Sequence, residues 1–450
     1  MPLPGRNRVI MDSLHGLTEF DESFRRILNT QELQRLRWIR QTGLACLVYP
    51  GAEHSRFSHA LGTYGIAKRA LDHLRSVAAL GTFSLSELDD ELGKAFLVGA
   101  LCHDLGHTAF SHVLEQLLLP KGIHSHEDCT FAILKAGRIG KVIRDVCDLD
   151  QVLHLLQGVH WNDGLCKLLD GHADVDRWDY LLRDAAGSGL VYGTYDLDWM
   201  VHSVYLYRDA ERRPRLVIEA PKGLVALKHF LAARRSMYQQ VYWYDTVRGA
   251  ERLLRAIFER ASDPDRPLGF KPPSTADIPS CLTGLLGGRQ LEMGEFLETD
   301  DTAVMSFLKF CAYRGPDPLL RYLSRCLLER RLFKLVVSGS DQNLESVRAA
   351  VKEALQRQAV PDLSALDKHD LEQAVDYLVL LDQCAFKADV RLSGILFDLG
   401  QTEPVPFEEL DTSLQEEISS GLGPFEQTRV FAPAELADAV KSAISHRSGE

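Results

Sequence analysis

Hydrophobic residues recur at helical spacing along most of the first 335 positions of the chain. In the segment 30–43, Leu33, Leu36 and Ile39 fall on one face, and Thr30 precedes them as the expected N-cap. The same period returns in three further segments, so helices are predicted at 30–43, 56–77, 89–107 and 223–261. The pattern therefore indicates a helical core.

Shorter runs with strand character interrupt this period. The segments MVHSVYLY (200–207) and RLVIEA (215–220) flank the polar stretch RDAERRP, which predicts a β-hairpin. The Pro-rich segment 262–280 predicts a loop, and after Lys334 the strand-like runs KLVVSG, GILFDLG and TRVFAP alternate with helical segments. We therefore predict a mainly α protein, with a helical core and small hairpin over 1–335 and a smaller α+β lobe over 336–450.

Composition narrows the function classes. The chain of 450 residues carries 51 basic and 63 acidic side chains, a net charge of −12, which weighs against a broad surface for duplex nucleic acid. No apolar signal segment opens the chain, and no run is long enough to span a membrane. The nine cysteines form no C-x-x-C pair. We expect a cytoplasmic protein with reduced thiols and no membrane partner.

Histidine is concentrated in one region. Of 16 histidines, eight lie between His54 and His126, and the stretch LCHDLGHTAFSH (101–112) holds three of them beside an aspartate. On a helix, His103 and Asp104 would meet at one edge, and a histidine four residues later would share the face of His103. Two ligands do not hold a metal ion, so further donors are needed.

Two other segments offer such donors. The segment HSRFSHALG contains His59, and HADVDRWDYLLRDA contains an acidic run that includes Asp176. Together with His103 and Asp104 they would build a mixed histidine and carboxylate site, which suits Mn, Fe, Zn or Mg. A second His-Asp pair, at 369–370, has no such neighbours and is interpreted as an exposed helix start.

The combination of these motifs resembles a known family. The segments LQRLRWIRQTG, YPGAEHSRFSHALGT, LCHDLGHTAFSH, HE (126–127) and DVDRWDYLLRD are similar to the HD-domain deoxynucleoside triphosphate triphosphohydrolases. That family includes the catalytic core of the sterile-alpha-motif and HD-domain restriction factor. The resemblance is strong over about 7–260. It implies an HD-domain helical core that releases deoxynucleoside and inorganic triphosphate, by attack of metal-activated water on the α-phosphate.

The resemblance also implies roles for individual residues. Four would hold the divalent metal: His59, His103, Asp104 and Asp176. Four would act in catalysis. His107 and His126 would contact the α-phosphate, His112 would be the general acid on the leaving oxygen, and Glu115 would orient that acid. Seven would bind the substrate. The phosphates would meet Arg56, Arg177 and Arg234. The sugar 3′-hydroxyl would bind Gln41 and Asp184, and the sugar ring would pack against Tyr180 and Tyr242.

The family's activator surface is matched only in part. Shortly after Tyr242, Tyr244 and Asp245 replace a histidine and a lysine, which leaves open the contacts with the substrate base and does not concern this surface. Within the activator surface, Asn29 replaces an aspartate that reads guanine. Four other positions of that surface still match: Gln34, Arg37, Arg330 and Lys334. The resemblance therefore implies an allosteric nucleotide of open base preference, and a homo-oligomer.

Two other functions are considered: a nuclease that would use the same metal chemistry, and a binding protein that would use none. An HD-type nuclease acting on single-stranded ends would need a basic path out of the pocket, which four arginines near the hairpin could supply: Arg208, Arg212, Arg213 and Arg215. A nucleotide-binding scaffold with a dead site would be expected to have lost a ligand, and this chain retains all four.

Overall fold

The computed structural model describes most of the chain. It covers residues 8–78, 88–263, 279–283, 289–339, 344–357, 360–364, 366, 368–386, 392, 394–400, 403–419 and 425–447. The fold is mainly α with small sheets, as the hydrophobic pattern predicts. No helix among these residues is both long and apolar enough to cross a membrane.

Three helices form the centre of the first hydrophobic core: α3 (Arg56–Val77), α4 (Asp90–Cys102) and α10 (Val175–Ser188). Helix α3 packs against both others. Its bounds match the predicted 56–77, and the N-cap Ser55 accepts a hydrogen bond from the backbone of Ser58 at 3.4 Å. Around them lie α1 (Glu22–Leu28), α2 (Gln31–Arg35), α5 (Glu115–Leu118), α6 (His126–Ala136), α7 (Arg138–Arg144), α8 (Leu149–Leu156), α9 (Asp163–Leu169) and α11 (Leu197–His202).

Two predicted helices end earlier than expected. The segment 30–43 is helical only to Trp38, because Ile39 is extended and the backbone N–H of Arg40 turns to a carboxylate oxygen of Asp301 at 3.0 Å. The helix predicted over 89–107 is confirmed at its start but wrong at its end, since α4 stops at Cys102 and turns follow.

The predicted hairpin is confirmed as β3 (Val204–Arg208) and β4 (Pro214–Glu219), which pair antiparallel. Residues 200–202 belong instead to α11. A second hairpin, β1 (Arg8–Asp12) with β2 (Gly16–Phe20), was not predicted. Strand β4 also pairs in parallel with β7 (Ile395–Asp398), which in turn pairs with β8 (Val405–Pro406).

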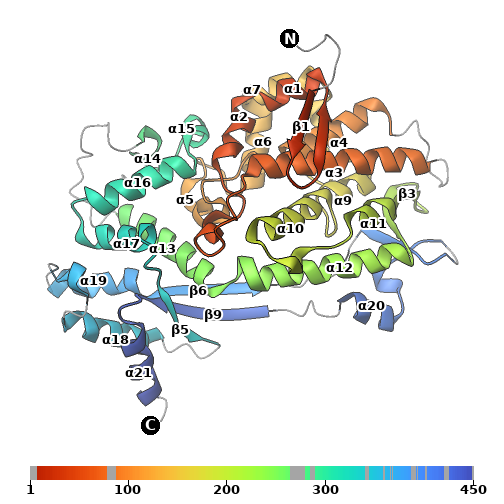
Figure 1. Ribbon diagram of the computed structural model, residues 1–450. Coiled ribbons are helices and arrows are strands. Elements are labelled where there is room, and N and C mark those ends of the chain that lie inside the picture. The colour runs from red at the N-terminus through yellow and green to blue at the C-terminus, as the bar shows by residue number, and fades with distance from the viewer. Residues whose placement is uncertain are drawn as a thin grey trace.

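The predicted long helix 223–261 is interrupted. It consists of α12 (Lys222–Met237), a π-helical turn at Tyr238–Tyr242, and α13 (Asp245–Ala261). A π-turn places one extra residue in the helix and is often found at functional sites. This interruption redirects the chain, so that α12 and α13 reach different parts of the molecule (Figure 1).

Helix α13 enters a second hydrophobic core. That core contains the sheet β5 (Lys334–Ser338), β9 (Phe425–Ala432) and β6 (Leu380–Phe386), in the order β5-β9-β6. The remaining helices are α14 (Ser280–Thr283), α15 (Met293–Glu298), α16 (Asp301–Tyr313), α17 (Pro318–Leu328), α18 (Leu344–Gln356), α19 (Lys368–Leu378), α20 (Thr412–Ser419) and α21 (Ala437–Arg447). The runs KLVVSG, GILFDLG and TRVFAP contain strands as predicted. The lobe boundary at 335 stays a prediction, and 264–278 of the predicted loop lie outside the described residues.

Candidate metal and phosphate site

The four predicted metal ligands lie together. His59 projects from α3, His103 and Asp104 follow the end of α4, and Asp176 stands in the first turn of α10. The Nε2 atom of His59 lies 2.9 Å from Asp176 Oδ1 and 3.2 Å from His103 Nε2. Asp104 Oδ1 lies 3.3 Å from His103 Nε2. Three segments far apart in sequence therefore converge on one point.

The outer nitrogens of both imidazoles are held by other groups. His59 Nδ1 donates to Asp179 at 2.7 Å, and His103 Nδ1 donates to the carbonyl oxygen of Ala100 at 2.9 Å. These bonds favour the tautomer in which each Nε2 carries a lone pair towards the cluster. Two such nitrogens and two carboxylates form a donor set that fits a divalent metal.

The charges around the cluster favour a cation. Burial alone would lower the pKa of His59, but Asp176 and Asp179 raise it to about 10. In the same way, Asp104 and Asp176 outweigh burial and raise the pKa of His103 to about 9. Without a metal, protons on the imidazoles balance the carboxylates, and a metal would replace that positive charge.

The turn after α4 depends on a glycine. A Cβ atom on Gly106 would overlap the carbonyl oxygen of His126, so only glycine allows this close approach to α6. The backbone N–H of Gly106 also donates to Thr130 at 2.9 Å, and the Thr130 hydroxyl donates to the carbonyl oxygen of His103 at 3.0 Å. Convergence of His103 and Asp104 thus results from a turn and not from the helical face that the sequence suggested.

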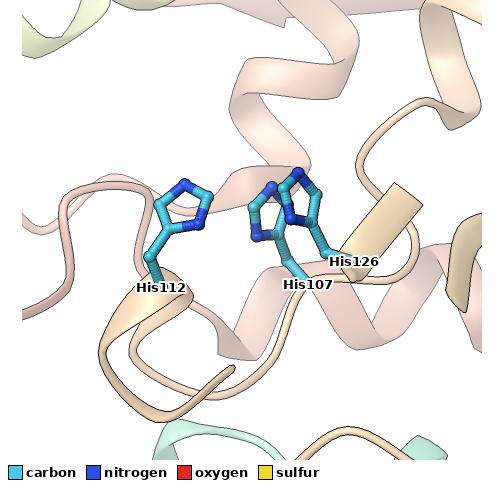
Figure 2. A group of neighbouring side chains, drawn as sticks. All are labelled: His107, His112 and His126. Atoms are coloured by element: carbon cyan, nitrogen blue, oxygen red, sulfur yellow. The ribbon is translucent and has the colours of Figure 1, made fainter. Parts of the chain in front are cut away.

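A second cluster consists of three histidines, whose side chains Figure 2 shows, and it lies beside the first cluster. The rings of His107 and His126 stack with centroids 4.0 Å apart, and His112 meets them edge-on at 4.9 Å and 5.1 Å. Glu115 joins two of them, accepting from Nδ1 of His112 and Nδ1 of His126, each at 2.9 Å. His107 Nε2 lies 3.2 Å from Asp104 Oδ1, which connects the two clusters.

The three imidazoles differ in their electrostatics. Burial and then the charge of Arg56 hold the pKa of His107 well below its ordinary value. Burial also opposes protonation of His126, but its hydrogen bond to Glu115 raises the pKa. His126 therefore holds a proton more strongly than His107 does.

Arg56 is fixed between the metal cluster and a strained turn. Its Nη1 donates to Asp104 at 2.5 Å, and its Nε and Nη2 donate to the hydroxyl of Ser111 at 3.1 Å and 2.8 Å. Phe110 and Ser111 both have left-handed backbones, with φ of 53° and 57°. Asp301 holds this turn by accepting the backbone N–H of Phe110 at 2.7 Å.

The clusters open into a cavity of about 540 Å³. Most predicted site residues line it: Gln41, Arg56, His103, Asp104, His107, His112, His126, Asp176, Arg177, Tyr180, Asp184 and Tyr242. Three predicted site residues are not in its wall: His59, Glu115, and Arg234, whose guanidinium lies 5.8 Å from the ring of Tyr238. Within the wall, Arg177 is ion-paired with Asp174.

No family model matches the chain. It is 30% identical to the uncharacterised protein YwfO of Bacillus subtilis over 346 residues, which are 75% of this chain and 74% of YwfO. A protein of Acanthamoeba polyphaga mimivirus that is named for an HD domain, L394, is 24% identical over 265 residues, covering 55% of this chain and 56% of L394.

A third relative has a named activity. The deoxynucleoside triphosphate triphosphohydrolase SAMHD1 homolog of Dictyostelium discoideum is 32% identical over 191 residues, 40% of this chain but only 36% of that protein. A solved phosphohydrolase from Bacteroides thetaiotaomicron, BT4208, has the same fold, with a TM-score of 0.77 at 24% identity over 95% of this chain and 100% of its own. The chain belongs to the HD-domain phosphohydrolase family.

Other residues of this HD-domain site were not singled out from the sequence. Asp179 orients His59, and His54 donates from Nε2 to Asp184 at 2.7 Å. The hydroxyl of Tyr242 donates to the same carboxylate at 2.6 Å. For His54, the available signal in the sequence was its position five residues before His59, because His54 directly precedes the N-cap of α3 and His59 lies in the first turn of that helix.

The remaining predicted surfaces lie elsewhere on the HD-domain fold. Arg213 and Arg215 line a different hollow, near Trp161, and both form ion pairs with Asp209. Of the residues matching the activator surface, Arg37 donates to Gln34 at 2.8 Å, and the guanidinium of Arg330 donates to a backbone carbonyl at 2.6 Å.

Proposed function

We propose that this HD-domain phosphohydrolase is a deoxynucleoside triphosphate triphosphohydrolase. The observation that carries the proposal is the convergence of four metal-type donors with three histidines and Arg56 in one cavity. Partial similarity to a named deoxynucleoside triphosphate triphosphohydrolase supports the choice of substrate.

His59, His103, Asp104 and Asp176 would hold the divalent ion, whether Mn, Mg, Fe or Zn. When bound, such an ion lowers the pKa of water and withdraws charge from a phosphate. Asp179 keeps His59 in the required tautomer. The guanidinium of Arg56 and the imidazoles of His107 and His126 would meet the α-phosphate.

Hydrolysis forms a bond between a water oxygen and the α-phosphorus and breaks the bond from that phosphorus to O5′. His112 would deliver the proton that O5′ needs, because Glu115 accepts from its Nδ1 and leaves Nε2 to face the cavity. The products are the deoxynucleoside and inorganic triphosphate.

The sugar would lie against Tyr180 and Tyr242, whose rings are 6.3 Å apart at their centroids. Asp184, already fixed by His54 and Tyr242, would accept the 3′-hydroxyl, and Gln41 would add a second contact there. The carbonyl oxygen of the Gln41 side chain is buried and has no hydrogen-bond partner among the described residues. Arg177 and Arg234 would meet the outer phosphates.

The competing function is an HD-type nuclease for single-stranded ends. Its basic path is not favoured, because Arg213 and Arg215 line a separate hollow and are neutralised by carboxylates. The homo-oligomer and the allosteric nucleotide also remain proposals that rest on the family resemblance.

One assay separates these functions. The purified protein is incubated with Mn or Mg and either a panel of four deoxynucleoside triphosphates or an end-labelled single strand. We expect inorganic triphosphate and deoxynucleoside from the first, and no mononucleotide from the second. An Asp104→Ala variant that retains full activity would refute the metal assignment for either reaction.

A further inference from the structure

The wall of the cavity contains three arginines that the proposed mechanism does not use. Arg248, Arg252 and Arg255 stand at i, i+4 and i+7 on α13, which places them along one helical face. All three line the same cavity as the metal and histidine clusters. Helix α13 also packs on the segment Ser111–Leu114, which carries His112. These guanidinium groups are therefore part of the same binding space.

Their partners differ. Arg248 donates to both carboxylate oxygens of Asp382, at 3.1 Å and 2.5 Å, and to Glu251 at 2.7 Å. Arg255 donates to Glu259 at 2.8 Å. These bonds occupy donors of both side chains within the protein.

Arg252 lies between them and forms no hydrogen bond or ion pair with a carboxylate of the residues that the structure describes. Its Nε atom is buried and has no hydrogen-bond partner within the described part of the chain. Burial and then the positive charge of Arg255 lower its pKa from the ordinary value. The carboxylates of Glu259 and Asp382 oppose this shift, and the charge of Arg248 adds to it. A buried guanidinium nitrogen without a hydrogen-bond partner is unfavourable unless a ligand atom accepts from it.

We propose that Arg252, assisted by Arg255, forms a second phosphate-binding subsite at the α13 end of the cavity. The cavity would then hold phosphate groups at two places, one beside Arg56 and His107 and one on α13. The planar fork of a guanidinium matches two phosphate oxygens, and its charge strengthens both bonds. The identity of the bound molecule as a nucleotide rests on the proposed function, but phosphate binding by α13 does not.

Binding of inorganic triphosphate tests this subsite without catalysis. The titration is done by calorimetry on the full chain with EDTA present, so that no metal bridges ligand and protein. We compare the wild type with Arg252→Gln and with Arg357→Gln, a control whose side chain is 75% exposed and paired with Glu353 on α18. We expect the Kd to rise about tenfold or more for Arg252→Gln and to stay unchanged for the control.

An Arg252→Lys variant guards against misfolding, since it keeps the charge and should weaken binding less than Arg252→Gln. A second arm uses a 5′-phosphorylated thymidine dinucleotide: weakening of triphosphate alone assigns the subsite to polyphosphate, and weakening of the dinucleotide alone assigns it to a phosphodiester. Equal affinity of wild type and Arg252→Gln for both ligands overturns the inference. If Arg252→Gln weakens binding but no nucleotide is hydrolysed, the subsite stands and the proposed function fails.

Discussion

Asp179 offers the sharpest test of how the candidate site is supported. Its carboxylate is fully buried and accepts four hydrogen bonds. Oδ2 accepts from His59 Nδ1 at 2.7 Å and Arg183 Nε at 2.8 Å, and Oδ1 accepts from His15 Nε2 at 2.7 Å and Arg183 Nη2 at 2.9 Å. In Asp179→Asn, one of these oxygens becomes an NH₂ group. Because each oxygen faces an Arg183 donor, either orientation of the amide sets donor against donor.

The cost can be worked out from these contacts. Removing one partner of a buried ion pair costs about 3–5 kcal/mol. Among the carboxylates that the structure describes, Arg183 would retain that of Asp12, at 2.9 Å. The second effect concerns the metal, since loss of the carboxylate behind a histidine ligand weakens metal affinity by roughly 10–100-fold. We therefore expect Asp179→Asn to be strongly destabilised and to bind Mn weakly.

Urea unfolding in EDTA gives the first quantity, and calorimetric titration with Mn gives the second. Asp198→Asn is the matched control, because Asp198 is 75% exposed and pairs with Arg69 at the surface, where a pair contributes about 0–1 kcal/mol. If Asp179→Asn unfolds within about 1 kcal/mol of the control and binds Mn as the wild type does, the reasoning about this carboxylate is refuted.

Three further substitutions test other parts of the site. Gly62→Ala should lower the free energy of unfolding by about 1–3 kcal/mol, because the added Cβ would overlap the buried carboxylate of Asp179. The control Gly294→Ala should change the free energy of unfolding far less, because Gly294 has open space around it. Equal urea midpoints for the two variants would contradict this. Asp301→Asn can keep only one of its two hydrogen bonds from backbone N–H groups, so we expect the free energy of unfolding to fall by about 1–3 kcal/mol and kcat to fall as well. If neither the free energy of unfolding nor kcat changes, the left-handed turn at Phe110 does not depend on this carboxylate. For Glu115, burial alone would raise the pKa, but hydrogen bonds from two histidines lower it below the ordinary 4.5. Because the pKa is lowered in the folded protein, the ionised carboxylate stabilises the fold above pH 4.5, and this stabilisation is lost progressively as the pH falls below 4.5. The difference in unfolding free energy between wild type and Glu115→Gln should therefore shrink from about pH 6 to about pH 3. A difference independent of pH would contradict this.

Much of the fold follows from local patterns in the sequence. The helix at 56–77 has a polar N-cap and a continuous apolar face, and the hairpin at 204–219 has alternating residues around a polar turn, so both were predictable. The break at Tyr238–Tyr242 was not, because the residues on both sides favour helix and no glycine or proline marks the π-turn in the sequence.

The candidate site divides in the same way. His59, His103 and Asp176 were predictable because chemistry-bearing residues are concentrated in short segments. The support from Asp179 and the positions of the α13 arginines were not, since those residues reach the site only through tertiary packing. Asp179 is one of several acidic residues in its segment, and Arg252 is one of several arginines in the segment 248–260. Nothing in their spacing marks either residue.

The central claim is that a divalent ion binds among His59, His103, Asp104 and Asp176 and not within the histidine trio. Both groups bring potential ligand atoms close together, so the two positions compete. Anomalous diffraction at the Mn edge from a crystal soaked in Mn distinguishes them directly. The account predicts one strong peak between α3, the end of α4 and α10. A peak only among His107, His112 and His126, or no peak at all, would contradict it.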